Sequence, residues 1–231
     1  MEIKCVLFDI DDTLYDTSLQ MSMARLNAVK AMVEAGLPAN IEIAYRIFEE
    51  IVNEFGPHYN QHFDRLLERL GLKWNPRVIA AGVTAYRETS SAYLKTYPDT
   101  VPTLLKLREN GYKLGIVSEG KAVKQWQKLI QLGIQHLFHY VLISEEIKEN
   151  SVTPKMFELV LKEFNASPKE TVFVGNQLDT DILCANKAGV ISIRMRKGEH
   201  RVEEPKSLEM APKYEINKVS EIFEALKKLE K

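Results

Sequence analysis

The chain has 231 residues, of which 45% are hydrophobic and 27% charged, and its formal net charge is −1. A chain of this length can form one large α/β domain or a domain with an insertion. The balance of 31 basic and 32 acidic residues indicates neither a nucleic-acid surface nor a membrane surface. No segment approaches the ~18 apolar residues of a membrane span, and the first apolar run is too short for a signal peptide. We therefore expect a cytoplasmic protein.

The two cysteines, Cys5 and Cys184, both lie in apolar segments and lack the paired spacing of a metal site. Free cysteine is among the most buried residue types. We interpret both side chains as buried thiols.

The first predicted element is a strand at residues 3–8, where the chain is almost continuously apolar, as in a strand buried on both faces of a parallel sheet. From about Thr17 to Tyr97, apolar residues instead recur at spacings of three and four, and Gly and Pro break the pattern. This pattern predicts about four helices and no strand. We expect a core domain of residues 1–16 and 97–231, with an all-helical insertion at 17–96.

Beyond Pro98, predicted helices and strands alternate along the chain. The helices are expected at 100–110, 121–132, 154–164, 180–187 and 219–229, and the strands at 113–117, 140–143, 171–174, 191–194 and 214–216. The charged stretch from Arg194 to Pro212 is interpreted as a surface excursion. Alternation at this spacing predicts an α/β fold with a doubly wound parallel sheet.

In such a sheet, ligands gather at the carboxyl ends of the strands. Three aspartates, Asp9, Asp11 and Asp12, directly follow the first predicted strand. Like charges this close repel, unless a cation lies among them or a pKa is shifted. Oxygen ligands suit Mg²⁺, and one carboxylate could attack phosphorus while a second transfers protons. The alternative is a loop whose aspartates only cap the backbone.

The string FDIDDTLYD, from Phe8 to Asp16, resembles the first motif, hhhhDxDxT, of the haloacid dehalogenase (HAD) superfamily. The resemblance implies a HAD-like Rossmannoid core. It also implies that Asp9 is the nucleophile that forms an aspartyl-phosphate and binds the metal. Asp11 would be the general acid and base, with its backbone carbonyl on Mg²⁺, and Thr13 would support the loop beside the substrate. Asp12 and Asp16 match companions without a catalytic role.

The second motif of the superfamily is an apolar strand that ends in Ser or Thr, and Ser118 follows such a run here. The Ser118 hydroxyl, with the amides of Glu119 and Gly120, would hold the phosphoryl oxygens of the substrate. Ser118 is also interpreted as the N-cap of the next helix. Both roles can hold together.

The fourth motif normally carries a metal-binding aspartate after a strand, and this chain has Asn176 at that position. An amide oxygen can coordinate Mg²⁺ but brings no charge, so we expect weaker metal binding. Asp181 keeps the position of the second carboxylate that supports the metal. Asp179 is interpreted as a residue at the helix start.

The third motif normally contributes a lysine followed by proline, and Ser151 and Val152 occupy those positions here. That lysine balances the carboxylates and holds the phosphoryl group. Lys155, one helical turn further on, is the expected replacement, and Lys148 is a second candidate. Both residues equally fit the role of solvated surface lysines.

The helical insertion lies where the superfamily carries a C1 cap, which closes over the site and chooses the substrate. Two residues of the insertion, His62 and Arg87, could contact substrate, although a solvated helix face explains each of them as well. The resemblance covers essentially the whole chain. It is closest to small archaeal-type HAD hydrolases, a group that includes glyceraldehyde 3-phosphate phosphatases.

These features predict a Mg²⁺-dependent phosphatase for a small phosphorylated metabolite, a monomer or homodimer without nucleic-acid or membrane partners. A 2-haloacid dehalogenase is disfavoured because Asp11 occupies a position where dehalogenases have no acid. A HAD-fold protein with a regulatory or binding role stays open, because the charge is lost at Asn176 and Ser151.

Overall fold

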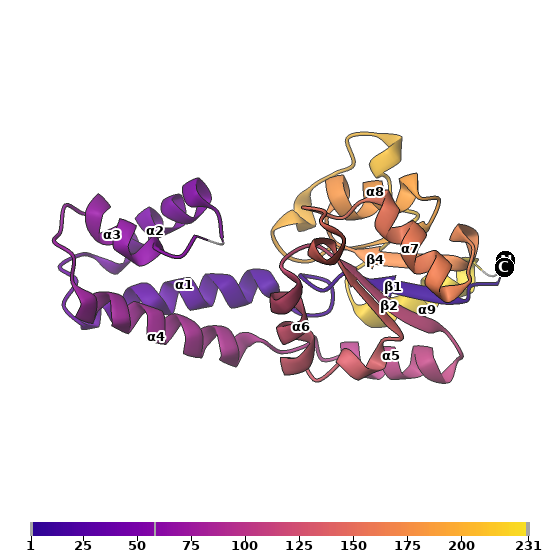
Figure 1. Ribbon diagram of the computed structural model, residues 1–231, viewed down its shortest axis with the longest axis horizontal. Coiled ribbons are helices and arrows are strands. Elements are labelled where there is room, and N and C mark those ends of the chain that lie inside the picture. Colours follow the sequence, from indigo (N-terminus) through magenta and orange to yellow (C-terminus); the bar gives the residue numbers. More distant parts are fainter. Residues whose placement is uncertain (1, 58, 230–231) are drawn as a thin grey trace. The chain divides into compact units, whose positions relative to one another are not determined.

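The computed structural model describes residues 2–57 and 59–229, which form two compact units. The helical unit comprises Leu19–Tyr93. The α/β unit contains the described residues up to Ser18 and from Leu94 onward. The two units are coloured along the chain in Figure 1.

The α/β unit is a single parallel sheet with helices on both faces. Its strands are β1 (Cys5–Phe8), β2 (Lys113–Ser118), β3 (Tyr140–Ile143), β4 (Thr171–Gly175), β5 (Ile191–Met195) and β6 (Tyr214–Ile216). Its helices after the insertion are α5 (Thr100–Glu109), α6 (Ala122–Gln131), α7 (Pro154–Phe164), α8 (Leu183–Lys187) and α9 (Ile222–Leu229).

The apolar run of β1 is explained by burial on both sides of the sheet. Val6 and Phe8 belong to one buried cluster, together with residues of α5, α6 and α9. Cys5 and Leu7 alternate with them and belong to a second cluster, with residues of α7 and α8. Figure 1 shows α5 and α9 on one side of the sheet and α7 and α8 on the other. A strand covered on both faces has no polar side, as the sequence predicts.

The strand order is β3-β2-β1-β4-β5-β6, and every neighbouring pair is parallel. Strands β2 and β3 lie on one side of β1 in the sheet, and β4, β5 and β6 lie on the other side. This reversal of strand order places a topological switch point at the carboxyl end of β1. The doubly wound α/β fold predicted from the sequence is confirmed.

The helical unit has four α-helices among its described residues and its own apolar core. They are α1 (Thr17–Glu34, which begins in the α/β unit), α2 (Ile41–Phe55), α3 (His62–Arg69) and α4 (Pro76–Tyr93). The packing of α4 on α1 depends on Gly82, where an added Cβ would lie 2.8 Å from Cγ of Met32. Within the described part of the chain, no helix is both long and apolar enough to cross a bilayer.

Three local expectations need correction. Cys184 is only half-buried, because it lies in the first turn of a short helix, whereas Cys5 is buried as expected. Arg194 does not belong to a surface excursion: its side chain is fully buried and donates hydrogen bonds to the carbonyls of His200 and Glu203. The helix expected to begin at residue 180 begins instead at Leu183, because residues Leu178–Ile182 form a π-helical turn.

Candidate active site

Asp9 lies immediately after β1, at the switch point of the sheet. Its backbone N–H donates to the carbonyl of Val174 on β4 at 2.9 Å, and its side chain is 6% exposed. Oδ1 accepts a 2.7 Å hydrogen bond from the hydroxyl of Ser118, the last residue of β2. Burial raises the pKa of Asp9 well above its usual range, and the charges of Asp181 and Asp11 raise it further. A cation beside Asp9 would favour its ionised form.

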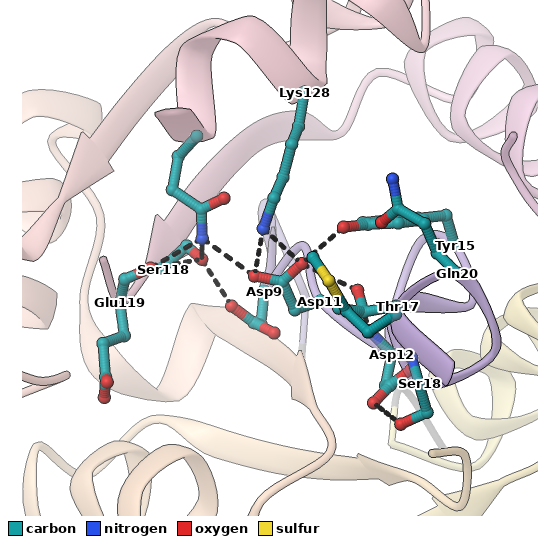
Figure 2. A network of polar contacts seen from close by, with 12 residues as sticks. Asp9, Asp11, Asp12, Tyr15, Thr17, Ser18, Gln20, Ser118, Glu119 and Lys128 are labelled. Atoms are coloured by element: carbon teal, nitrogen blue, oxygen red, sulfur yellow. Dashed lines mark hydrogen bonds and ion pairs between the residues drawn. The ribbon is translucent and has the colours of Figure 1, made fainter. Parts of the chain in front are cut away.

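Asp11 is surrounded by donors, as Figure 2 shows. Its carboxylate accepts hydrogen bonds from Tyr15 Oη at 2.8 Å, Thr17 Oγ1 at 2.7 Å and Gln125 Nε2 at 3.0 Å. Lys128 Nζ lies 2.7 Å from both carboxylate oxygens. Burial favours a raised pKa for Asp11, but the charge and hydrogen bond of Lys128 outweigh it and hold the pKa below the usual value. The side chain remains 31% exposed, so a ligand can reach it.

The other residues of the first motif shape the loop. Asp12 has a left-handed φ of 53°, and its carboxylate accepts hydrogen bonds from the backbone N–H and the hydroxyl of Ser18. Asp12 therefore caps α1, in the structural role expected for it. Thr13 is fully buried, and its backbone N–H bonds the carbonyl of Ile10 at 3.4 Å. This position suits support of the loop, while contact with substrate would require Thr13 to become exposed.

The second motif lies beside the first, at the end of the neighbouring strand. Ser118 is 1% exposed and bonds Asp9, so the interpretation of Ser118 as a helix N-cap is wrong. Helix α6 begins at Ala122, and the N–H of that residue donates instead to Glu145 at 2.8 Å. The amide of Gly120 donates to Ser144 Oγ at 3.1 Å, so it would have to exchange this partner for a phosphoryl oxygen.

Glu119 adds a further carboxylate near this group. Burial raises its pKa, and the charges of Asp11 and Asp179 raise it further. Its backbone carbonyl accepts a 2.6 Å hydrogen bond from Gln125 Nε2. The contribution of Glu119 to this network therefore comes from both its backbone and its charge.

The fourth motif follows β4 and turns back on itself. Oδ2 of Asp181 accepts hydrogen bonds from the amides of Asn176 at 2.9 Å and Gln177 at 3.1 Å. Gly175 makes this turn possible, because an added Cβ would lie 2.6 Å from Asp181 Oδ2. Burial raises the pKa of Asp181 to about 6, although the two amide hydrogen bonds lower it. Asp179, in contrast, is exposed.

The side-chain oxygen of Asn176 supports the prediction of a metal site. Asn176 is 2% exposed, and its Oδ1 has no hydrogen-bond donor among the described residues. A buried acceptor without a donor is costly, and a hard cation would satisfy it. The described residues contain no cluster of three or more His, Cys, Asp and Glu arranged to hold a metal. The expected ligands are the carboxylates of Asp9 and Asp181, the amide of Asn176 and the backbone carbonyl of Asp11. They do not form such a cluster, but all four groups offer oxygen atoms, which Mg²⁺ prefers.

The lysines expected from the third motif lie on the surface. The side chain of Lys155 is 59% exposed, and its Nζ lies 3.4 Å from Oε1 of Glu149. Lys148 is also exposed and has a left-handed φ of 60°. Ser151 is half-buried, with its hydroxyl 3.5 Å from the carbonyl of Val152. Lys128, which does not belong to any of the predicted motifs, is instead the lysine whose ammonium contacts the carboxylate of Asp11.

Of the two cap residues singled out from the sequence, Arg87 is exposed. His62 is half-buried, and its Nε2 lies 2.9 Å from the carbonyl of Gly56. Its ring also packs edge-on against Phe48. His62 is thus engaged within the helical unit.

The chain belongs to the haloacid dehalogenase-like hydrolase family, whose model matches residues 6–195. It is 47% identical to a glyceraldehyde 3-phosphate phosphatase of Methanopyrus kandleri, and the alignment covers 99% of each chain. A protein of the same name from Pyrococcus furiosus is 37% identical, over 98% of this chain and 94% of the relative.

Solved structures have the same fold. The magnesium-bound HAD-hydrolase YfnB from Bacillus subtilis has a TM-score of 0.70 at 21% identity, over 98% of this chain and 99% of that one. An HAD phosphatase from Thermococcus onnurineus has a TM-score of 0.63 at 25% identity, over 97% and 98% of the two chains. An L-2-haloacid dehalogenase is also similar, with a TM-score of 0.68 at 22% identity over 98% of this chain and 100% of that one.

Proposed function

We propose that the protein is a Mg²⁺-dependent phosphatase that hydrolyses a small phosphorylated metabolite, glyceraldehyde 3-phosphate in the first instance, through a phosphorylated Asp9. The observation that carries this proposal is the placement of Asp9: it is buried, bonded to Ser118 and adjacent to Asp11 at the switch point of the sheet. The names of the two archaeal relatives support the choice of substrate.

In the first step, a carboxylate oxygen of Asp9 attacks phosphorus, and the bond from phosphorus to the ester oxygen breaks. Asp11 gives its proton to the departing oxygen, which leaves as an alcohol. In the second step, water attacks the phosphorus of the aspartyl-phosphate, and Asp11 takes a proton from it. The bond from phosphorus to Asp9 then breaks, and inorganic phosphate leaves.

The first step requires a protonated Asp11, whereas Lys128 favours the ionised form. Weakening of the contact with Lys128 in the substrate complex would leave burial, which favours the protonated form. The second step requires the ionised form that the free protein already has. The same side chain can therefore serve first as acid and then as base.

Asp9, Asp181, Asn176 and the backbone carbonyl of Asp11 would hold Mg²⁺. When bound, the ion would supply the positive charge that keeps Asp9 ionised and offsets charge on the phosphoryl oxygens. Ser118 holds Asp9 in position in the free protein, and its single hydroxyl proton would turn from Asp9 to a phosphoryl oxygen in the substrate complex. Asp11 also separates this proposal from dehalogenation, because a departing halide needs no proton.

The helical unit is inserted between the first and second motifs, and we assign it the role of a cap that selects the substrate. Caps of this kind exclude water and contribute contacts to the part of the substrate that does not react. The separate apolar core of the unit is consistent with a module whose sequence can vary without loss of the catalytic fold.

Hydrolysis of p-nitrophenyl phosphate and of glyceraldehyde 3-phosphate, each with Mg²⁺ and with EDTA, tests the proposal. Activity should require Mg²⁺ and should disappear in Asp9→Asn. Asp11→Asn should slow the reaction by about 10²-fold or more, because proton transfer is lost. Full activity in EDTA would contradict the metal requirement, and activity in folded Asp9→Asn would exclude the aspartyl-phosphate.

A further inference from the structure

The site carries more negative charge than its recognised motifs balance. Asp9, Asp11, Glu119 and Asp181 influence one another electrostatically. A phosphate ester adds up to two further negative charges. Ser151 occupies the position of the third-motif lysine. The motifs therefore contribute no positively charged side chain to this site.

Lys128 is placed to supply that cation. Its Nζ lies 2.7 Å from each oxygen of Asp11 and 5.9 Å from the ring centroid of Tyr15, and its side chain is only 21% exposed. Among the ion pairs of the described residues, only the one made by Lys128 reaches one of these four carboxylates. Because the Lys128 side chain is mostly buried, its ammonium group is less solvated than those of the exposed lysines.

The same helix ties Lys128 to the nucleophile. Gln125 precedes Lys128 by three residues and so lies on the same face of α6. Its Nε2 lies 3.0 Å from Asp11 Oδ2 and 3.2 Å from Ser118 Oγ, while Ser118 bonds Asp9. Figure 2 shows the Lys128 ammonium directed at Asp11, in the group that also contains Asp9 and Ser118.

We propose that Lys128 is a catalytic residue that binds the phosphoryl group of the substrate in place of the third-motif lysine. This inference rests on the proposed function and adds the cation that function requires. An ammonium group has three donors, so Lys128 can turn from Asp11 toward the phosphoryl oxygens without losing all contact with the carboxylate. Lys155, exposed and paired with Glu149, does not have this placement.

Two measurements on the full chain with saturating Mg²⁺ test the role of Lys128: kcat/KM for p-nitrophenyl phosphate, and the Kd of inorganic phosphate by calorimetry. In Lys128→Met, kcat/KM should fall by about 10²–10³-fold, and phosphate should bind about tenfold or more weakly. Lys128→Arg should recover part of both. Lys124→Met, an exposed lysine one turn earlier on α6, is the matched control and should change neither by more than about twofold.

A double-variant cycle separates phosphate binding from mere support of Asp11. If Lys128 contacts phosphate, Lys128→Met should weaken phosphate binding in an Asp11→Asn background as well. If Lys128 only holds Asp11, the second substitution adds no loss, and the proposal is overturned. Ser151→Lys added to Lys128→Met should restore part of the phosphate affinity, because it returns a cation to the position of the motif.

A larger loss in Lys155→Met than in Lys128→Met would also overturn the proposal. Far-ultraviolet circular dichroism and thermal melting establish that each variant is folded, and Lys128→Gln replaces the Met variant if that one does not fold. A wild-type protein that binds phosphate but hydrolyses no ester would contradict the proposed function. The phosphate Kd would still decide whether Lys128 is its ligand.

Discussion

The hydroxyl of Ser118 donates a 2.7 Å hydrogen bond to Oδ1 of Asp9, between the carboxyl ends of two paired parallel strands. This bond fixes one oxygen of the proposed nucleophile and favours its ionised form. Ser118→Ala should lower kcat by about 10–10²-fold with little loss of stability, since one hydrogen bond contributes about 1 kcal/mol. Ser118→Thr, which keeps the hydroxyl, should retain most of the activity. Equal rates for the Ala and Thr variants would show that the hydroxyl does not matter.

Asn176 offers a way to strengthen the proposed metal site. Its buried Oδ1 has no donor among the residues that the structure describes, and its backbone N–H, which bonds Asp181, is unaffected by a side-chain change. Asn176→Asp should add a charged ligand, tighten Mg²⁺ binding and lower the Mg²⁺ concentration for half-maximal activity. Without metal, the same variant should be less stable, because it buries another carboxylate.

Calorimetric Mg²⁺ titration and metal-free melting of Asn176→Asp provide the two readouts. Asn176→Ala is the matched control and should weaken Mg²⁺ binding. If the Asp and Ala variants bind Mg²⁺ as the wild type does, residue 176 is not a ligand.

The raised pKa of Asp181 predicts opposite effects of pH with and without metal. This carboxyl has an ordinary pKa of 3.8 and one of about 6 in the folded chain, so between these values the folded state holds a proton that the unfolded state has lost. Without metal, the contribution of Asp181 to stability therefore falls as pH rises from about 4 to about 6. Mg²⁺ requires the ionised carboxylate, so stabilisation by Mg²⁺ should grow over the same range.

Melting curves at about pH 5 and about pH 7.5, with and without Mg²⁺, check this expectation. Asp181→Asn keeps an oxygen for the two backbone amides but cannot ionise. In metal-free buffer, the Tm of the variant minus that of the wild type should increase by a few degrees as pH rises. With Mg²⁺, the variant should show a smaller pH-dependent stabilisation, because Asp9 is then the only proposed carboxylate ligand that still has to ionise. A Mg²⁺ shift in Tm that is equal at both pH values would contradict the assignment of Asp181 to the metal site.

The connections to the helical unit permit a test of its proposed role as a cap. Within the α/β unit, the outgoing and returning chains are adjacent: Tyr97 N–H donates to the carbonyl of Leu14 at 3.1 Å, and Tyr15 pairs with Thr96. A short Gly/Ser linker can therefore replace residues 19–93. The shortened protein should still hydrolyse p-nitrophenyl phosphate, while its preference for one metabolite over another should fall by about tenfold or more. Equal loss on all substrates, in a folded protein, would make the insertion part of the catalytic core.

The apolar pattern is enough to predict most of the sheet, because β1, β3 and β4 are mainly apolar runs and helical patterns separate the strands. Strand β6 and helix α7 begin and end at the predicted residues. The π-helical turn Leu178–Ile182 is not predictable from the pattern of apolar residues, which does not show that Asp181, within the turn, accepts a hydrogen bond from the amide of Asn176. The burial of Arg194 is not predictable from the pattern either: its partners, the carbonyls of His200 and Glu203 and the carboxylate of Glu215, follow it at some distance along the chain, and only the fold brings them to its guanidinium.

Some residues of the site can be predicted from the sequence, and others cannot. Asp9 and Ser118 were identifiable because each stands at the end of an apolar strand, where the fold places ligands. Lys128 was not identifiable, because the rotation of α6 about its axis decides whether a polar residue faces the site or the solvent. The spacing of three residues between Gln125 and Lys128 is the one sequence signal that they share a helix face.

Borohydride trapping shows whether Asp9 carries the phosphoryl group during turnover. Borohydride reduces an acyl-phosphate but not a free carboxylate, so a trapped aspartyl-phosphate becomes homoserine. Protein quenched during turnover of glyceraldehyde 3-phosphate with Mg²⁺ should contain homoserine at position 9 by peptide mass spectrometry, and protein without substrate should not. Rapid phosphate release with an unmodified Asp9, or with homoserine at another aspartate, would show that Asp9 does not carry the phosphoryl group.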